Sequence, residues 1–184
     1  GRRRGDLSTR CRFGRSDLAY KVLLQEENPG WMFPVKNGAT TMWERWDSWT
    51  PEAGFHPQEM NSFNHYAYGA IGNWLFQNAG GIRADLDAPG FRRFSLAPEP
   101  DTSLKRFEVS FDSPYGLIES SWKWKNKGKQ LEYSFTAPPN TEADVSLPDR
   151  GKKKPRLGKQ PVPGKREGDF WVFPLGPGSY KVTS

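Results

Sequence analysis

The sequence has very little cysteine and no long apolar stretch. Cys11 is the only cysteine among 184 residues, which excludes an internal disulfide framework and a metal site built on cysteine. No run of about 18 apolar residues occurs, so no segment is expected to cross a membrane. The N-terminus is basic but lacks the apolar stretch of a secretory signal peptide.

Histidine is almost as scarce, and this limits the possible cofactors. The two histidines, His56 and His65, lack the paired spacing that binds a transition metal, so we expect no metal. Glycine-rich phosphate loops, nucleophile elbows and dinucleotide fingerprints are absent, so we expect no organic cofactor. The single cysteine is compatible with the cytoplasm, but localisation and oligomeric state stay undetermined at this stage.

The net charge of +6 is distributed unevenly. Residues 1–15 carry +5 and residues 150–166 carry +8, whereas residues 16–149 carry −6. The basic residues therefore lie in two irregular segments beside an acidic body. Such segments can bind polyanions, but no recognition helix or RNA-binding signature accompanies them. We therefore expect solvated loops and no nucleic-acid partner.

Two amphipathic helices are predicted in the first half of the chain. Residues 16–27 have an apolar stripe of helical spacing, and the serine at its start is the expected N-cap. Residues 61–79 follow the same spacing, with Asn61 or Ser62 as the expected cap. Residues 31–60 between them lack helical periodicity, and such a long irregular connection is usually functional.

The glycines of the second predicted helix suggest a larger assembly of helices. Gly69 and Gly72 would weaken an exposed helix, so we expect them to permit close packing against another helix or beneath a site. Gly80 and Gly81 are expected to end the helix. Two helices bury their apolar faces poorly, so we expect the chain to be a fragment that holds the end of a larger helical domain.

From residue 91 onward the pattern changes to short alternating runs. Period-two alternation over residues 107–111 and 117–122 predicts antiparallel strands, and "SPYG" at 113–116 predicts a hairpin turn. The basic residues 149–168 interrupt the strands as a loop. The chain as a whole is therefore expected to be α+β, with helices followed by a β-sandwich.

The stretch "ATTMWERWDSW" at residues 39–49 holds the best candidates for chemistry. Glu44 lies between Trp43 and Trp46, and a carboxylate beside indole rings suits a sugar site, since glycoside hydrolysis uses carboxyl groups. Glu44 could equally form a structural ion pair with Arg45 or another basic residue. Asp47 is expected to be a turn or hydrogen-bonding residue.

Three further side chains near this stretch have two possible roles. His65 could donate a hydrogen bond to a sugar hydroxyl, or it could be a satisfied core histidine. Trp43 and Trp46 could stack on a sugar ring, or they could belong to the core.

Several motifs resemble the C-terminal part of bacterial α-L-rhamnosidases of glycoside hydrolase family 78. The resemblance covers residues 14–184 in order. Its barrel motifs are "SDLAYKVLLQEENPGW", "GATTMWERWDSWTPEAGF", "MNSFNHYAYGAIGNWLF" and "AGGIRADLDAPGFRRF", and its sandwich motifs are "DSPYGLIESSW" and "APPNTEADVSLP".

The resemblance implies a domain organisation. Residues 15–90 would be the last helices of an (α/α)6 catalytic barrel, and residues 91–184 a C-terminal antiparallel β-sandwich with a basic loop at 149–168. Residues 1–14 are arginine-rich and depart from the family, so we expect a truncated or frame-shifted reading there.

The resemblance also implies a reaction, the hydrolysis of terminal α-L-rhamnose from a glycoside or polysaccharide with inversion of configuration. Glu44 would be the general base, His65 would contact the rhamnose, and Trp43 and Trp46 would help to wall the pocket. The general acid would lie upstream, so the isolated chain is expected to be inactive. The alternative is a non-catalytic carbohydrate-binding or structural β-sandwich module.

Overall fold

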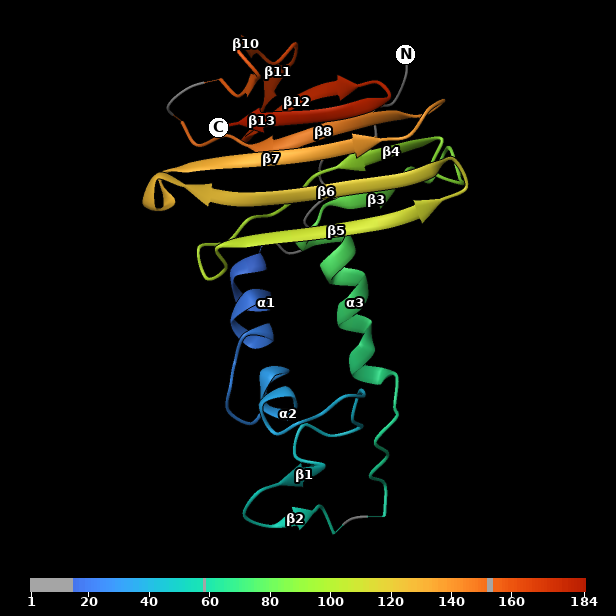
Figure 1. Ribbon diagram of the computed structural model, residues 1–184, viewed down its shortest axis with the longest axis vertical. Coiled ribbons are helices and arrows are strands. Elements are labelled where there is room, and N and C mark those ends of the chain that lie inside the picture. Colours follow the sequence, from blue (N-terminus) through green and yellow to red (C-terminus); the bar gives the residue numbers. More distant parts are fainter. Residues whose placement is uncertain (1–14, 58, 152–153) are drawn as a thin grey trace. The chain divides into compact units, whose positions relative to one another are not determined.

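The computed structural model describes residues 15–57, 59–151 and 154–184. The described residues form two compact units, residues 15–74 and residues 75–184. Figure 1 shows helices in the first unit and strands mainly in the second, so the predicted α+β class is confirmed. The prediction of an atypical segment at the N-terminus lies outside the described residues.

The first helix, α1 (Ser16–Leu23), is shorter than predicted. Arg15, and not Ser16, takes the N-cap position, and no side chain caps the helix. Asp17 lies in the first turn, where its negative charge interacts favourably with the helix dipole, and it pairs with Arg15 at 3.0 Å. The helix ends before Asn28-Pro29, so the last predicted turn is not helical.

The helix α1 is anchored by Tyr20, which is almost fully buried. Its ring meets Trp74 of α3 (Ile71–Trp74) edge to face at a centroid distance of 4.9 Å. By contrast, Leu18 and Val22 of the predicted apolar stripe stay exposed and line an apolar groove of about 570 Å³. The stripe therefore has little to pack against within this unit.

The predicted helix over residues 61–79 is wrong in its first part. Residues 61–66 are not helical, and the helical stretch consists of the 3₁₀-helix η2 (Ala67–Ala70), then α3, then the π-helix η3 (Leu75–Ala79). The cap prediction fails because the Ser62 N–H donates to the Glu44 side chain and the His65 N–H donates to a distant carbonyl. These contacts with the segment around Glu44 form in place of the first predicted helical turn.

The predicted close packing at Gly69 and Gly72 is also not found. A Cβ atom built at either glycine would meet nothing within 4 Å in the described chain. Inside this unit, then, the two glycines border open space.

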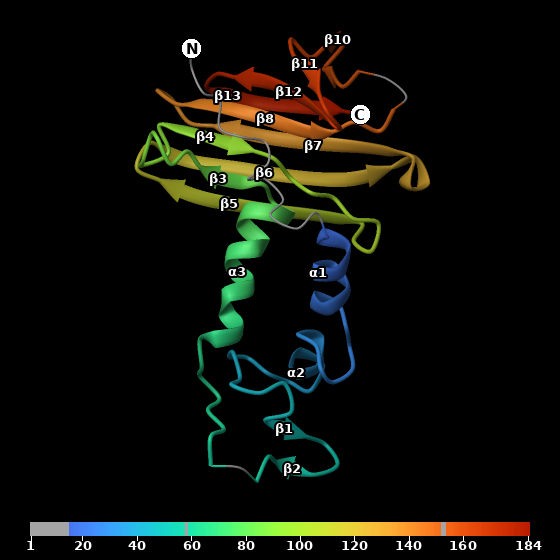
Figure 2. The ribbon, with the colours of Figure 1, turned by 180° about the vertical axis from the view of Figure 1, so that it is seen from behind.

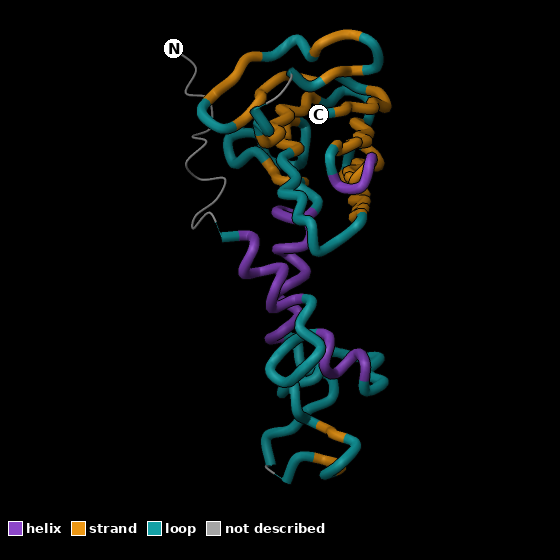
Figure 3. The backbone as a smooth tube through the Cα atoms, turned by 90° about the vertical axis from the view of Figure 1, so that its left-hand side faces the viewer, coloured by secondary structure: helices purple, strands orange, loops and turns teal. Residues whose placement is uncertain are grey.

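The connection before η2 is mostly irregular, as expected, and is drawn largely in teal in Figure 3. It contains one short helix, α2 (Met32–Lys36), which the sequence did not reveal. Two short strands, β1 (Trp49–Thr50) and β2 (Gly54–Phe55), form an antiparallel hairpin. No helix in the described ranges is long and apolar enough to cross a membrane.

The second unit is a sandwich of two β-sheets (Figures 1 and 2). The six-stranded sheet has the order β10 (Gln160–Pro161), β9 (Arg156–Leu157), β13 (Gly178–Thr183), β7 (Gln130–Ala137), β6 (Gly116–Lys125) and β5 (Arg106–Ser113). The five-stranded sheet has the order β11 (Lys165–Glu167), β12 (Phe170–Leu175), β8 (Glu142–Pro148), β4 (Arg93–Leu96) and β3 (Ile82–Ala84). The pair β4–β8 is parallel, while the other described pairs are antiparallel.

Alternation along the strands builds the core of the sandwich. Successive side chains of a strand point to opposite faces, and in β7 the residues alternate between half-buried and fully buried. Each large apolar side chain that becomes buried contributes about 1.5–3 kcal/mol. The largest fully buried side chains of this unit are Trp122, Tyr133, Phe94, Phe135, Phe173, Leu96, Ile118, Leu131, Leu147, Val145 and Val162.

Two connections of the sandwich bear on the sequence predictions. The hairpin turn in "SPYG" is confirmed, with Ser113 paired to Gly116 and the Ser113 Oγ donating to the Gly116 carbonyl at 2.7 Å. The basic segment 149–168 carries the short strands β9, β10 and β11, which extend the edges of both sheets. The boundary after residue 90 stays a prediction; β3 before it pairs with β4 after it.

Candidate functional site

Two segments far apart in sequence lie side by side in the first unit. The Glu44 N–H donates to the Ser62 carbonyl at 2.8 Å, and the His65 N–H donates to the Met42 carbonyl at 2.8 Å. These backbone hydrogen bonds bring the motif "TTMWERWD" next to "NSFNHYAYG". The two predicted site residues Glu44 and His65 are therefore neighbours in space.

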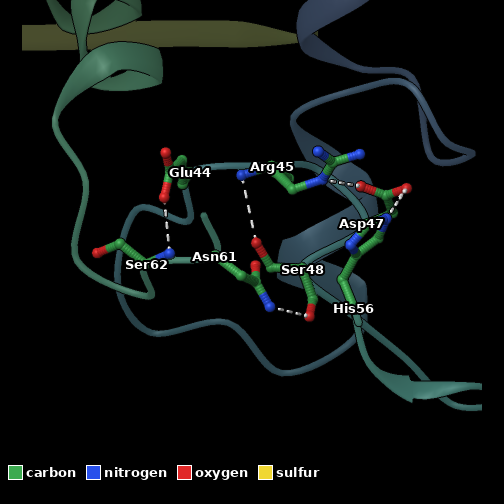
Figure 4. Close-up of polar contacts among 7 residues, drawn as sticks. All are labelled: Glu44, Arg45, Asp47, Ser48, His56, Asn61 and Ser62. Atoms are coloured by element: carbon green, nitrogen blue, oxygen red, sulfur yellow. Dashed lines mark hydrogen bonds and ion pairs between the residues drawn. The ribbon is translucent and has the colours of Figure 1, made fainter. Parts of the chain in front are cut away.

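The carboxylate of Glu44 has two different oxygens. Oε2 accepts a hydrogen bond from the Ser62 N–H at 2.8 Å (Figure 4). Oε1 lies 4.0 Å from the His65 Nε2 atom. The side chain is 18% exposed, so it is shielded but still reachable from solvent. Ser62 holds both the backbone and the side chain of Glu44, which restricts how the carboxylate can rotate.

The hydrogen bonds of His65 define its neutral tautomer. The Ala67 N–H donates to Nδ1 at 3.2 Å, so Nδ1 is an acceptor and, in the neutral ring, Nε2 carries the proton. That N–H group lies on the side of Glu44. The imidazole is 36% exposed and stacks on Tyr66 at 5.6 Å. His65 is therefore not a buried core histidine.

The two candidate tryptophans have different surroundings. Trp43 is only 7% exposed and meets Phe63 edge to face at 5.2 Å. Trp46 is partly exposed and stacks on Tyr68 at 4.7 Å with nearly parallel rings, and it meets Trp31 in an edge-to-face arrangement at 5.4 Å. Their predicted role as walls of a sugar pocket stays a prediction.

The charged neighbours of Glu44 are engaged in a separate contact. Arg45 Nε donates to Asp47 at 3.2 Å, and the other oxygen of Asp47 lies 3.9 Å from His56 Nε2 (Figure 4). Asp47 is thus a hydrogen-bonding residue, as expected. The contacts described for the Glu44 carboxylate are with Ser62 and His65, so the alternative pairing of Glu44 with Arg45 gains no support.

Sequence reasoning missed the residue that joins these segments, Ser48, which is fully buried. Its Oγ accepts from the Arg45 N–H at 3.2 Å, and its carbonyl accepts from the Asn61 Nδ2 at 3.0 Å and from the His56 N–H at 2.9 Å. A serine and an asparagine in an irregular segment give no periodic signal, and Asn61 also fits the pattern of a helix cap.

The site holds carboxylates and imidazoles but no metal-binding arrangement. Within the ranges that the structure describes, no group of three or more His, Cys, Asp or Glu side chains is placed to hold a metal ion. The arrangement around Glu44 suits proton transfer, because one carboxylate oxygen is fixed and the other faces a partly exposed imidazole N–H.

Two family models match the chain. The bacterial alpha-L-rhamnosidase six-hairpin glycosidase domain matches residues 7–79. The bacterial alpha-L-rhamnosidase C-terminal domain matches residues 81–160. The junction of the two matches falls at Gly80, directly after the π-helix η3.

Curated relatives carry the same name. An alpha-L-rhamnosidase from Formosa agariphila is 45% identical over 135 residues, which are 73% of this chain and 14% of the relative. An alpha-L-rhamnosidase from Streptomyces avermitilis is 38% identical over 171 residues, which are 92% of this chain and 16% of the relative. The chain thus spans only a small part of the length of these relatives.

Solved structures agree with the sequence matches. The crystal structure of the Streptomyces avermitilis alpha-L-rhamnosidase complexed with L-rhamnose has a TM-score of 0.80 and 35% identity, and covers 93% of this chain and 16% of that chain. The crystal structure of the native enzyme from Aspergillus terreus has a TM-score of 0.77 and 33% identity. This match covers 95% of this chain and 18% of that chain. The resemblance seen in the motifs is confirmed: the chain belongs to the bacterial α-L-rhamnosidase family and contains sequence from both its six-hairpin domain and its C-terminal domain.

Proposed function

We propose that this chain supplies the general base of an inverting α-L-rhamnosidase, with Glu44 as that base. The observation that carries the proposal is the double hydrogen bond between Glu44 and Ser62, 2.8 Å in both directions. It holds Oε2 and leaves Oε1 beside the His65 N–H group in a partly exposed position. A general base needs this combination of fixed orientation and access to water.

The proposed reaction is the hydrolysis of terminal α-L-rhamnose from a glycoside or polysaccharide. Glu44 takes a proton from water, the water oxygen attacks the anomeric carbon, and a second carboxyl group protonates the leaving oxygen. Asp47 is already paired with Arg45 and His56, so we assign the acid to a part of the enzyme outside this chain. In inverting enzymes the two carboxyl groups lie about 6.5–9.5 Å apart, with water between them.

His65 is proposed to bind the sugar. Its Nδ1 accepts from the Ala67 N–H, so the neutral ring presents the Nε2 proton to an acceptor such as a sugar hydroxyl oxygen. The exposed fraction of 36% leaves that edge accessible. Trp43 and Trp46 are proposed to shape the wall beside Glu44, since an indole face packs well on a pyranose ring.

The proposal is tested in a chimera in which residues 15–184 of this chain replace the matching segment of the Streptomyces avermitilis enzyme. The chimera is expected to release the aglycone from an aryl α-L-rhamnoside. Glu44→Gln keeps the acceptor for the Ser62 N–H but removes the base, so we expect kcat to fall by roughly 10²–10⁴-fold with KM little changed.

A matched control removes a carboxylate from the same irregular segment. Glu52→Gln changes an exposed residue in the turn of the β1–β2 hairpin and is expected to leave kcat unchanged. A folded chimera without turnover, or a Glu44→Gln variant whose kcat stays within about threefold of the unsubstituted chimera, would overturn the proposed function.

A further inference from the structure

The hydrogen bonds around Glu44 belong to a larger network that includes residues Glu44 does not contact directly. Glu44 is bound by Ser62, Ser62 follows Asn61, and Asn61 Nδ2 donates to the Ser48 carbonyl at 3.0 Å (Figure 4). Ser48 in turn binds Arg45, the residue after Glu44, through its Oγ at 3.2 Å and its N–H at 3.3 Å. We call this set Glu44, Arg45, Ser48, Asn61 and Ser62 the base clamp.

The clamp has a first part, Glu44, Arg45 and Ser48, and a second part, Asn61 and Ser62. Apart from the contact of the Glu44 carboxylate, the Ser48–Asn61 hydrogen bond is the only described side-chain link between these two parts. It links the start of residues 49–60 to their end, alongside the backbone hydrogen bond from the His56 N–H to the same Ser48 carbonyl at 2.9 Å. Ser48 is fully buried, so its carbonyl cannot exchange Asn61 for water without cost. The link therefore adds a side-chain restraint to the backbone hydrogen bonds that place the Ser62 N–H group beside Glu44.

The two polar atoms of the Asn61 side-chain amide differ in their hydrogen bonding. Its nitrogen donates to Ser48, whereas its Oδ1 atom is buried and has no hydrogen-bond partner among the described residues. A buried acceptor without a partner costs stability. A side chain that serves packing alone would not need that polar atom, so the contact with Ser48 points to a role in placing its neighbours.

We propose that Asn61 is a positioning residue for Glu44, acting through Ser48 and Ser62, and that the clamp reserves Oε1 for the proton taken from water. This inference rests on the proposed function of Glu44 as the base. Because the clamp holds Oε2 through the Ser62 N–H, the free oxygen is the one beside His65. Loss of the clamp should therefore reduce kcat and leave the binding of substrate largely intact.

The test measures kcat and KM of the same chimera with two substitutions of similar shape. Asn61→Leu removes the amide, and Asn61→Asp places an oxygen against the Ser48 carbonyl. Because a displacement of about 1 Å can cost about a hundredfold in rate, we expect kcat to fall by roughly 10–100-fold, with KM within about twofold.

The deciding measurement repeats Asn61→Leu in the Glu44→Gln background. A residue that acts through Glu44 has no further effect once the base is gone, so the residual turnover should stay unchanged. The matched control is Asn37→Leu, because Asn37 Nδ2 also donates to a backbone carbonyl, that of Phe33, but at the C-terminal end of α2. We expect this control to keep kcat.

The outcomes separate the two proposals. If Glu44→Gln keeps its turnover, the proposed function fails. If Glu44→Gln lowers kcat as expected but both Asn61 variants keep kcat, or if Asn61→Leu lowers kcat by the same factor with Glu44 as with Gln at position 44, the positioning role of Asn61 is overturned while the base assignment stands.

Discussion

At the scale of single residues, the site is built by backbone groups as much as by side chains. Ser62 orients Glu44 through its N–H and its carbonyl, and the Ala67 N–H determines the tautomer of His65. Any residue other than proline could supply such N–H groups. Motifs could therefore propose Glu44 and His65 as candidates, which the structure brings together, whereas they could not reveal the groups that orient these side chains.

Gly81, at the start of the sandwich, has a backbone conformation and close neighbours that disfavour any larger residue. Its φ is +77°, and a Cβ atom there would lie 2.1 Å from the Pro98 nitrogen. We expect Gly81→Ala to lower the free energy of unfolding by about 2 kcal/mol or more, because conformational strain and a backbone clash add. Chemical denaturation of the chain, followed by tryptophan fluorescence, measures the change.

The control for Gly81 is Gly168→Ala. Gly168 also has a positive φ, +58°, but a Cβ atom there would meet nothing within 4 Å, so only the conformational strain remains. A loss at Gly168 as large as that at Gly81 would show that the backbone clash does not contribute.

At the scale of elements, strands were easier to predict than helices. The alternation over residues 107–111 and 117–122 identified β5 and β6 and the turn between them, because a period of two requires no distant partner. The helix predicted over 61–79 begins only at Ala67. Its first residues pair with the segment around Glu44, and such a tertiary contact overrides local periodicity.

The strands of the basic segment 149–168 also could not be predicted from periodicity. Its strands have only two or three residues each, too few for alternation to be visible. Two of its cations lie over indole rings, Arg150 over Trp124 at 4.6 Å and Lys154 over Trp171 at 5.3 Å. Such cation–π contacts hold the segment on the sandwich, and charge composition alone does not reveal them.

Asp149 is the hydrogen-bonding centre at the start of this segment. The Gly151 N–H donates to its carboxylate at 2.9 Å, Trp171 Nε1 donates at 3.2 Å, and Arg166 pairs with it at 2.6 Å. The Gly151 N–H makes the largest contribution to holding the pKa of Asp149 below its ordinary value; burial opposes the shift, and Trp171 and Arg166 add to it.

The lowered pKa predicts the pH range in which Asp149 stabilises the fold. The ionised carboxylate is favoured in the folded state, so its contribution is complete above the unfolded value of about 3.9 and is lost as the pH falls through the lower folded value. Asp149→Asn should therefore lower Tm at pH 7, and the difference should shrink as the pH falls below about 4. Thermal unfolding by circular dichroism from pH 7 to pH 2 measures it.

A comparison variant accounts for the loss of one negative charge. Asp112→Asn removes an exposed carboxylate from β5 and is expected to change Tm little at pH 7. If Asp149→Asn has the same Tm as the unsubstituted chain at pH 7, the contacts of Asp149 do not stabilise the segment.

At the scale of the whole molecule, the two units differ in how completely they bury their apolar residues. The sandwich has a core of fully buried aromatic and aliphatic side chains. The helical unit leaves Leu18 and Val22 exposed along an apolar groove, and Gly69 and Gly72 border open space. The match to a six-hairpin domain explains this difference, because the few helices of this unit cannot enclose a core that six hairpins share.

The same reasoning predicts that the 184-residue chain alone does not hydrolyse an aryl α-L-rhamnoside. The proposed base Glu44 activates water, but without an opposing acid the leaving oxygen is not protonated, and Asp47 is held by Arg45 and His56. The measurement is aglycone release by the purified chain, with the active chimera as the positive control. Turnover by the isolated chain that disappears in Glu44→Gln would mean that a second carboxyl group within these residues completes the site.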